Sequence, residues 1–256
     1  MKIDFGLTAG DYAKHRAGFP SSFFDKLSEY GIGLPGQNIV DLGTGTGTLA
    51  RGFAARGANV IGIDPSAPLL AQAKQLSESA QLQIDYRVGT AENTGLANAT
   101  VDIVTAGQCW HWFDRPRAAQ EVTRILKANG YVALAHFDWI PLKGNVVEAT
   151  EQLIEAHNPA WKMGGGTGLH PQWLRDIAEV GFREIQTFSY DVFVPYSHED
   201  WRGRIRASAG VAASLSPEKV EVFDQELATL LVAKYPTPIL QAHHRVSAVI
   251  AKSPSS

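Results

Sequence analysis

The chain has 256 residues, of which 45% are hydrophobic and 19% carry a charged side chain, and its formal net charge is −3. A chain of this size can bury a substantial core, and its slightly acidic balance gives no general attraction to nucleic acid or to an anionic membrane. No apolar run approaches the roughly 18 residues that a spanning helix needs, and we expect no secretory signal in the first residues. A single cysteine, Cys109, excludes an internal disulfide and favours a reducing compartment, so we expect a cytoplasmic protein.

Short apolar runs alternate with segments of helical periodicity through the first half of the chain. In chain order, the predicted elements are a helix at 21–31, a strand at 38–42, a helix at 46–56, a strand at 60–63, a helix at 66–79, strands at 82–88 and 101–106, a helix at 115–128 and a strand at 131–135. Strands that alternate with helices of this length indicate a parallel sheet with helices on both faces.

The pattern changes after Pro141, where helices predominate. The elements predicted there are helices at 145–157 and 171–180, a strand at 182–194, helices at 198–208 and 217–234, and a strand at 245–251. The chain has no repeat and no obvious linker, so we expect one domain over residues 1–256. Its predicted core covers approximately 34–140, 170–195 and 240–252, and its predicted helical cap covers approximately 1–33, 141–169 and 196–239.

A glycine-rich turn follows the first predicted strand, in the segment NIVDLGTGTGTLA at residues 38–50. Gly43 and Gly45 lie in this turn, Asp41 precedes them, and a second acid, Asp64, ends the next strand. In a doubly wound sheet, ligands bind outside the carboxyl ends of the strands, and glycine lets the backbone approach a ligand where a Cβ would collide. The acids and the turn therefore predict a site for a nucleotide-like ligand.

The same residues restrict the class of ligand. A dinucleotide fingerprint has a third glycine where this chain has Thr48, and no Lys-Ser or Lys-Thr pair follows the turn as in a phosphate-binding loop. The carboxylate of Asp41 would repel a diphosphate and could favour a cation. These residues favour a ligand with a ribose and a positive charge but no phosphate, and S-adenosylmethionine meets that description. A nicotinamide-dependent oxidoreductase is the alternative, and Thr48 and Asp41 argue against it.

Four features in order along roughly residues 38–140 resemble the class I S-adenosylmethionine-dependent methyltransferases. They are VDLGTGTGTLA, Asp64, GTAENTGLANATVDIVTAGQCWHWFD and LKANGYVALAHFDW. Within that superfamily the chain is similar to the small-molecule branch called type 11, near the trans-aconitate methyltransferases. The resemblance implies a Rossmann-like, doubly wound, mostly parallel sheet of about seven strands with the last one antiparallel. It also implies S-adenosyl-L-methionine as cofactor and a small-molecule acceptor. A catalytically inactive cofactor-binding protein of the same fold is a further alternative.

The resemblance assigns cofactor contacts to individual residues. Asp64 is expected to accept hydrogen bonds from both ribose hydroxyls, because a carboxylate offers two acceptor oxygens, although it could instead cap the helix that follows. Asp41 is expected beside the amino acid portion of the cofactor. Thr90 and Ala91 are at the positions where the family reads adenine, although family members often have Asp in place of Thr90. The other predicted cofactor residues are Tyr12 and Arg16 of the N-terminal arm, Gly43, Thr44, Gly45, Pro65, Glu92, Gln108 and Trp110.

Aromatic residues and histidines follow the fourth and fifth predicted strands. A large aromatic residue such as Trp110 is usually part of a core, but its face could also lie beside a sulfonium. A base is needed only when the nucleophile must lose a proton, and histidine is the commonest one. The candidate catalytic residues are His111 and His136, with Asp138 and His170 as further candidate bases.

The residues after the fifth strand offer candidates for binding the acceptor, namely Trp139, Trp173, Arg202 and Arg206. On a helix the two arginines share a face, which would suit an anionic acceptor if turned inward and would be solvated surface if turned outward. The acceptor atom is expected to be oxygen, nitrogen or carbon, with a preference for a carboxylate or hydroxyl. We expect no metal site and no nucleic acid or membrane partner, and the sequence leaves the oligomeric state open.

Overall fold

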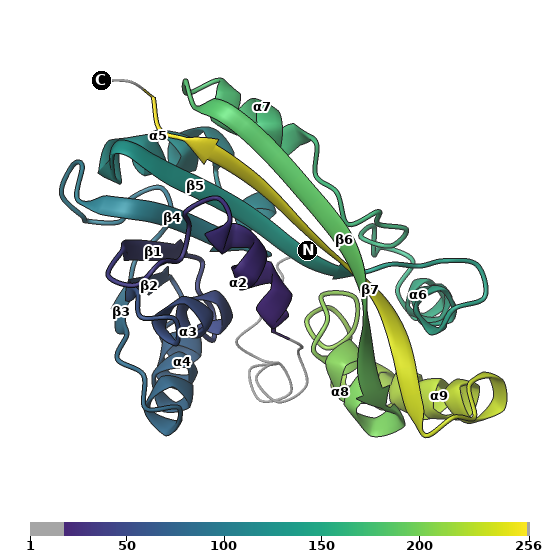
Figure 1. Ribbon diagram of the computed structural model, residues 1–256. Helices are drawn as coiled ribbons and strands as arrows, with labels where there is room; N and C mark the ends of the chain where they lie inside the picture. Colours follow the sequence, from purple (N-terminus) through teal and green to yellow (C-terminus); the bar gives the residue numbers. More distant parts are fainter. Residues whose placement is uncertain (1–17, 255–256) are drawn as a thin grey trace. The chain divides into compact units, whose positions relative to one another are not determined.

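The computed structural model describes residues 18–254, which include one seven-stranded sheet with the order β3-β2-β1-β4-β5-β7-β6 (Figure 1). The strands are β1 (Asn38–Leu42), β2 (Asn59–Asp64), β3 (Asp85–Val88), β4 (Val101–Gly107), β5 (Leu126–Trp139), β6 (Arg183–Ser197) and β7 (Ile239–Lys252). All four strand pairs among β1, β2, β3, β4 and β5 are parallel. By contrast, β7 runs antiparallel to its neighbours β5 and β6 (Figure 1). The predicted mostly parallel, doubly wound sheet with an antiparallel last strand is confirmed.

The described residues form two compact units. The sheet unit comprises residues 18–137, 169–189 and 246–254, and the helical unit comprises residues 138–168 and 190–245. The helices are α2 (Ser21–Ser28), α3 (Thr48–Ala54), α4 (Ala67–Ser79), α5 (Arg115–Ile125), α6 (Val146–His157), α7 (Gln172–Ala178), α8 (His198–Arg206) and α9 (Pro217–Lys234), with a 3-10 turn η2 (Trp110–Trp112). Helix α2 belongs to the sheet unit, which differs from the predicted cap over residues 1–33.

Strand β1 is buried from its second residue to its end. Because successive side chains of a strand face opposite sides of the sheet, Val40 and Leu42 enter a core shared with α5 and α7, and Asp41 points to the other side. Helices α5 and α7 contribute to that core Ala118, Val122, Ile125, Trp173 and Ile177. A central strand covered on both faces in this way is typical of parallel sheets, and it places its carboxyl end at a protected edge.

The start of α5 is as predicted, but its end is not. The side chain of Asp114 accepts a hydrogen bond from the N–H of Arg117, at 3.4 Å, and caps the helix. The predicted helix stop at Asn129-Gly130 is wrong, because β5 already begins at Leu126 and these residues lie inside it, where the pairing with β4 shifts its register. A Cβ at Gly130 would lie 2.8 Å from the carbonyl oxygen of Asp102, so the close approach of two strands requires glycine there.

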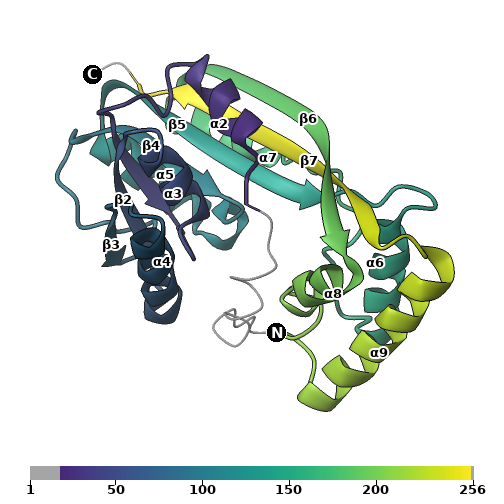
Figure 2. The same ribbon diagram turned by 60° about the horizontal axis from the view of Figure 1, so that its bottom comes forward.

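The helical unit has its own apolar core, and α9 lies beside both α6 and α8 (Figure 2). Trp201 of α8 and Phe223 of α9 are fully buried in it. The indole N–H of Trp201 donates to the hydroxyl of Thr150 on α6, at 3.0 Å. This bond satisfies the one polar atom of a buried tryptophan, and it joins two of the three helices.

Several boundaries extend beyond the predicted ones. Strand β5 continues to Trp139, β6 to Ser197, and β7 begins at Ile239, whereas β3 begins only at Asp85. Helix α3 begins at Thr48 rather than at Thr46 because Gly47, with φ of 78°, precedes it as the N-cap.

Over residues 18–254, no helix combines the length and the apolar composition that crossing a membrane would require.

Candidate cofactor and acceptor site

Asp41 ends the apolar part of β1 as a buried carboxylate, with 2% of its surface exposed. One oxygen accepts a hydrogen bond from the hydroxyl of Thr44, at 2.7 Å, and the other from Thr105 on β4, at 2.8 Å. Burial raises the pKa of Asp41 to about 6, and the charge of Asp64 acts in the same direction, while the two hydroxyl bonds oppose it. A positive charge placed nearby would therefore stabilise the ionised form of Asp41.

The glycines of the turn have different roles. At Gly43, with φ of 59°, a Cβ would lie 2.8 Å from the sulfur of Cys109, so the packing of the protein itself requires glycine there. At Gly47, a Cβ would collide with the hydroxyl of Tyr86. At Gly45, with φ of 55°, a Cβ would have no atom within 4 Å. Of the glycines within the turn, Gly45 alone faces open space, as a backbone that lies against a ligand must.

Asp64 ends β2 and is bonded to the turn. One of its oxygens accepts from the N–H of Gly45, at 2.9 Å, and the other from the N–H of Ser66, at 2.8 Å. Ser66, rather than Asp64, is the N-cap residue of α4. Burial raises the pKa of Asp64, and the two backbone bonds oppose the shift. Each carboxylate oxygen can accept more than one hydrogen bond, so both keep acceptor capacity for ribose hydroxyls.

The loop after β3 carries the residues predicted to read adenine. Thr90 is exposed and Ala91 is buried. Glu92 accepts a hydrogen bond from the N–H of Asp114, at 2.8 Å, and so ties this loop to the start of α5. This contact gives Glu92 a structural role, whereas its predicted contact with the cofactor stays a prediction.

The residues after β4 include one strained backbone and one core side chain. Gln108 has a φ of 61°, unusual for a residue with a Cβ, and its N–H donates to the carbonyl of Ala135 on β5, at 2.8 Å. Such strain is often found at functional sites. Trp110 has no exposed surface, and its indole N–H donates to Asp176, at 3.0 Å. Its ring belongs to the core, so we do not carry Trp110 into the site that we propose below.

Three histidines and a tryptophan gather at the ends of β4 and β5. His136 of β5 lies 4.4 Å from His170 and 5.7 Å from His111, measured between ring centres. The ring of His170 is stacked on that of Trp173, at 4.2 Å and 8°, and is nearly parallel to that of His111, at 6.2 Å and 9°. We call His111, His136 and His170 the histidine cluster. The sequence offered all three as bases, and the structure brings them together.

The environment of His170 favours its neutral ring. Burial lowers the pKa of His170, and charge on one of three rings this close disfavours charge on the others. Within residues 18–254, neither Nε2 of His170 nor Nε1 of the fully buried Trp173 has a hydrogen-bond partner. In the same range, no three His, Cys, Asp or Glu side chains are arranged to hold a metal ion.

Comparison with known proteins identifies the domain. Residues 40–134 match the family model of a methyltransferase domain. An uncharacterized methyltransferase of Mycobacterium tuberculosis is 31% identical, over 57% of this chain and 60% of that protein. A Saccharomyces cerevisiae protein named as a probable S-adenosylmethionine-dependent methyltransferase is 27% identical, over 68% of this chain and 58% of that protein. The chain contains a class I S-adenosylmethionine-dependent methyltransferase domain.

A solved structure shares the fold of this chain. Phosphoethanolamine N-methyltransferase 2 of Haemonchus contortus, in complex with S-adenosyl-L-methionine, matches with a TM-score of 0.57 and 17% identity, over 98% of this chain and 57% of that chain. At this identity the likeness shows the fold alone. S-adenosylmethionine is the cofactor of the domain, whereas the narrower similarity to trans-aconitate methyltransferases stays a prediction.

The residues at the carboxyl edge of the methyltransferase sheet fit this cofactor. The turn leaves space at Gly45, Asp64 keeps acceptor capacity, and two buried acids suit an ammonium or sulfonium group better than a phosphate. The individual cofactor contacts stay predictions, including those of Thr44 and Pro65. Tyr12 and Arg16 lie outside the described residues.

The predicted acceptor residues other than Trp173 belong to the helical unit. Arg202 and Arg206 both contact Asp224 on α9, the latter at 2.9 Å, so these charges join α8 to α9. The indole N–H of Trp139 donates to Glu151, at 2.7 Å, and Arg204 lies 4.7 Å above the Trp139 ring. These contacts explain both arginines as structural, and we do not include them in the proposed acceptor site.

Two polar residues that support the methyltransferase site were missed in the sequence. Thr105 holds Asp41, and it interrupts the apolar strand VDIVTAG at the position paired with Asp41, which was the available signal. Glu121 of α5 accepts from both the N–H and the hydroxyl of Thr94, at 2.8 and 2.5 Å, and so fixes the loop after β3. Nothing in the local pattern around Glu121 indicated that role.

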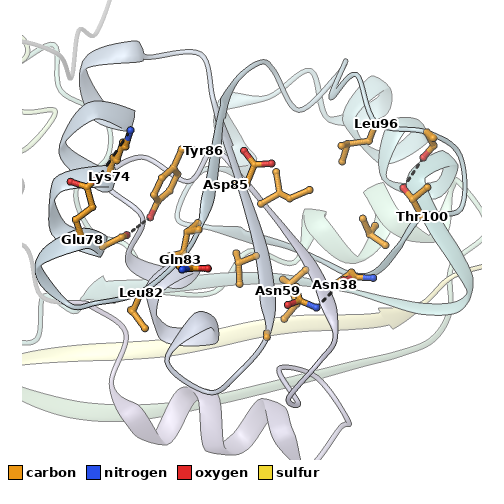
Figure 3. Close-up of a pocket in the computed structure, with 18 residues that line it drawn as sticks. Asn38, Asn59, Lys74, Glu78, Leu82, Gln83, Asp85, Tyr86, Leu96 and Thr100 are labelled. Atoms are coloured by element: carbon orange, nitrogen blue, oxygen red, sulfur yellow. Dashed lines mark hydrogen bonds and ion pairs between the residues drawn. The ribbon is translucent and has the colours of Figure 1, made fainter.

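A cavity of about 810 Å³ lies at the other edge of the sheet, at the amino ends of β1 to β4 (Figure 3). Asn38, Asn59 and Asp85, which begin three of these strands, line it together with Tyr86. It includes none of the predicted cofactor or acceptor residues. Its place is opposite to the edge where doubly wound sheets bind their ligands, so we assign it no part in methyl transfer.

Replacing Asp64 by alanine should weaken the binding of S-adenosylhomocysteine by about 1–3 kcal/mol, because charged hydrogen bonds to the ribose are lost. Isothermal titration calorimetry measures this affinity. Asp85→Ala is the matched control, since Asp85 is exposed, pairs with Arg87 and lies at the amino end of β3. If both variants bind S-adenosylhomocysteine equally well, Asp64 does not contact the ribose and serves only to accept the hydrogen bonds of Gly45 and Ser66.

Alanine substitutions at two glycines should separate binding from stability. Both variants place a Cβ at positive φ, at a cost of about 1–2 kcal/mol. Gly43→Ala adds overpacking against Cys109, so urea unfolding should find it about 1–3 kcal/mol less stable than Gly45→Ala. Gly45→Ala should lose affinity for S-adenosylhomocysteine instead. If Gly45→Ala binds as tightly as the wild type, the turn does not contact the cofactor.

Replacing Asp41 by asparagine should stabilise the ligand-free protein at pH 8. Burial raises the pKa of Asp41 from 3.8 to about 6. The contribution of its protonated carboxyl to the free energy of unfolding is therefore fully present below pH 4 and is lost as the pH rises through 6. This shift in pKa corresponds to about 3 kcal/mol in the free energy of unfolding, and Asp41→Asn should recover that free energy at pH 8 but not at pH 4. Urea unfolding at both pH values tests this. A variant that is less stable at pH 8 would show that the hydrogen bonds of the carboxylate outweigh its burial.

Proposed function

We propose that the protein uses S-adenosylmethionine to methylate a small molecule at an oxygen, nitrogen or carbon atom, with a preference for a hydroxyl or carboxylate oxygen. The observation that carries this proposal is the shared position of two sets of residues on the sheet unit. Asp64 ends β2 and Gly45 follows β1, while His111 follows β4, His136 lies near the end of β5, and the ring of His170 lies 4.4 Å from that of His136. Binding and proton transfer can therefore occur along one edge.

The cofactor supplies an electrophilic methyl group on a sulfonium. The residues of this chain then have to bind the cofactor and the acceptor, align the acceptor atom with the methyl group, and exclude water from the acceptor. Such alignment can provide much of the rate enhancement. Asp64 is assigned to the ribose, Asp41 to the positive end of the cofactor, and the backbone of Gly45 to the adenosyl group. His111 and His136 are assigned to the acceptor.

The activity of the whole protein is a proposal because the Mycobacterium tuberculosis and Saccharomyces cerevisiae relatives align with this chain over about 60% of their own length. A catalytically inactive binding protein would use the same cofactor residues. A nicotinamide-dependent oxidoreductase is disfavoured by the buried carboxylate of Asp41 beside the turn and by Thr48, which begins α3 where a dinucleotide site has glycine. Cytoplasmic location and the lack of nucleic acid or membrane partners stay predictions from the composition.

The test is methyl transfer by the purified full-length chain from labelled S-adenosylmethionine to a panel of small hydroxy and carboxy compounds, with the products identified by mass spectrometry. We expect one methyl group added to at least one compound, and less transfer by Asp64→Ala in proportion to its lost cofactor affinity. Separate titrations with S-adenosylhomocysteine and NADH accompany the assay. Tight binding of NADH alone would overturn the proposal, and cofactor binding without any transfer would favour the inactive protein.

A further inference from the structure

The histidine cluster lies next to the predicted cofactor residues through bonded neighbours. Cys109, two residues before His111, donates from its sulfur to the carbonyl of Leu42 at the end of β1, at 3.2 Å. Gln108 donates to the carbonyl of Ala135, the residue before His136, at 2.8 Å. The ends of β1, β4 and β5 are therefore tied together at the level of the cluster. An acceptor atom at this edge can be close to both a methyl donor and an imidazole.

The cluster is suited to take up one proton. Its rings lie 4.4–6.2 Å apart, so once one ring has taken up a proton, a second proton on either of the others is disfavoured. Trp173, stacked at 4.2 Å, presents its face to His170 and would stabilise a protonated ring by a cation–π contact. Arg115 and Asp176 pair with each other at 3.0 Å, and Asp176 also accepts the indole N–H of Trp110.

The side chains available at the carboxyl edge of the sheet favour a hydroxyl acceptor over a carboxylate acceptor. A carboxylic acid is already ionised at neutral pH, needs no base, and is best held by an arginine. The arginines that were candidates for that task are bonded to Asp224 in the helical unit. A phenol keeps its proton at neutral pH, yet it is acidic enough for an imidazole to share that proton. The ring of Trp112, which is 46% exposed, has its centre 4.7 Å from that of His111 and so adds an aromatic side chain next to the cluster.

We propose that the acceptor is a phenol-type hydroxyl compound whose proton passes to the histidine cluster when its oxygen is methylated. This inference rests on the proposed function. The acceptor oxygen forms the new bond to the methyl carbon, and the bond from that carbon to sulfur breaks with its electron pair left on sulfur. The O–H bond breaks as well, and its proton is taken by an imidazole nitrogen. Charge is conserved, because the sulfonium charge is replaced by the imidazolium charge.

The experiment uses 4-nitrophenol, whose ionised form absorbs visible light, as a probe of the full-length protein saturated with S-adenosylhomocysteine. At a pH where the free probe is mostly protonated, the ratio of ionised to neutral probe should rise about tenfold on binding, which corresponds to a pKa lowered by about one. His170→Gln and His111→Gln should abolish most of this rise. The control variant is His157→Gln, because His157 lies in the helical unit and contacts Glu226 at 3.0 Å.

Calorimetric titration of each variant with S-adenosylhomocysteine keeps the two proposals apart. If the wild type fails to bind S-adenosylhomocysteine, the proposed function fails. If it binds that ligand but does not bind 4-nitrophenol, binds it without ionisation, or ionises it equally in His170→Gln, then the histidine inference alone is overturned. 4-Nitrobenzoate is the matched carboxylate probe. Binding of 4-nitrobenzoate at least as tight as that of 4-nitrophenol would also overturn the inference.

Discussion

A hydrogen bond between Gly45 and Asp64 fixes the glycine-rich turn at the carboxyl edge of the sheet, where the cofactor is expected to bind. It joins the first strand's turn to the end of the second strand, and the N–H of Thr44, bonded to the carbonyl of Ile63 at 3.0 Å, strengthens that connection. On the other side, Gly43 packs against Cys109 from β4. The turn is therefore held from both neighbouring strands by the protein itself. A backbone fixed in this way is ordered before a ligand arrives, which lowers the entropic cost of binding.

Function and stability conflict at this edge. Asp41 and Asp64 are both buried, and burial raises the pKa of each, so in the ligand-free protein their negative charges are destabilising. The surrounding structure offsets that cost through hydroxyl and backbone donors. No arginine or lysine among the described residues contacts either carboxylate, although such a contact would stabilise the fold. A neutralising cation in the protein would compete with the positive charge of the cofactor, so the unneutralised pair is the arrangement expected of a binding site.

The sequence allowed most of the fold to be predicted, because the periodicities of the strands and helices are local. It also located the two acids and the glycine turn, since these interrupt apolar runs at strand ends. It did not distinguish the packing role of Gly43 from the open position of Gly45, because their φ angles are alike and only their neighbours differ. Similarly, Asn129 and Gly130 read as a helix stop, but the pairing of β5 with β4 overrides that local signal. Contacts between distant segments, such as that of Glu121 with Thr94, leave no local pattern.

The histidine cluster also depends on contacts between segments that are distant in the sequence. His136 lies in the part of β5 that belongs to the sheet unit, the chain then enters the helical unit at residue 138, and it returns at residue 169, just before His170. Both histidines therefore flank an insertion without belonging to it. The stacking of His170 on Trp173, and of Trp173 in the core with α5, anchors the return point to the sheet. Substitutions in the helical unit can consequently change what that unit contributes while the histidines that we propose as proton acceptors stay in place. This separation explains how aromatic and charged residues of the helical unit, such as Trp139 and Arg202, can serve packing without disturbing the chemistry proposed for the sheet unit.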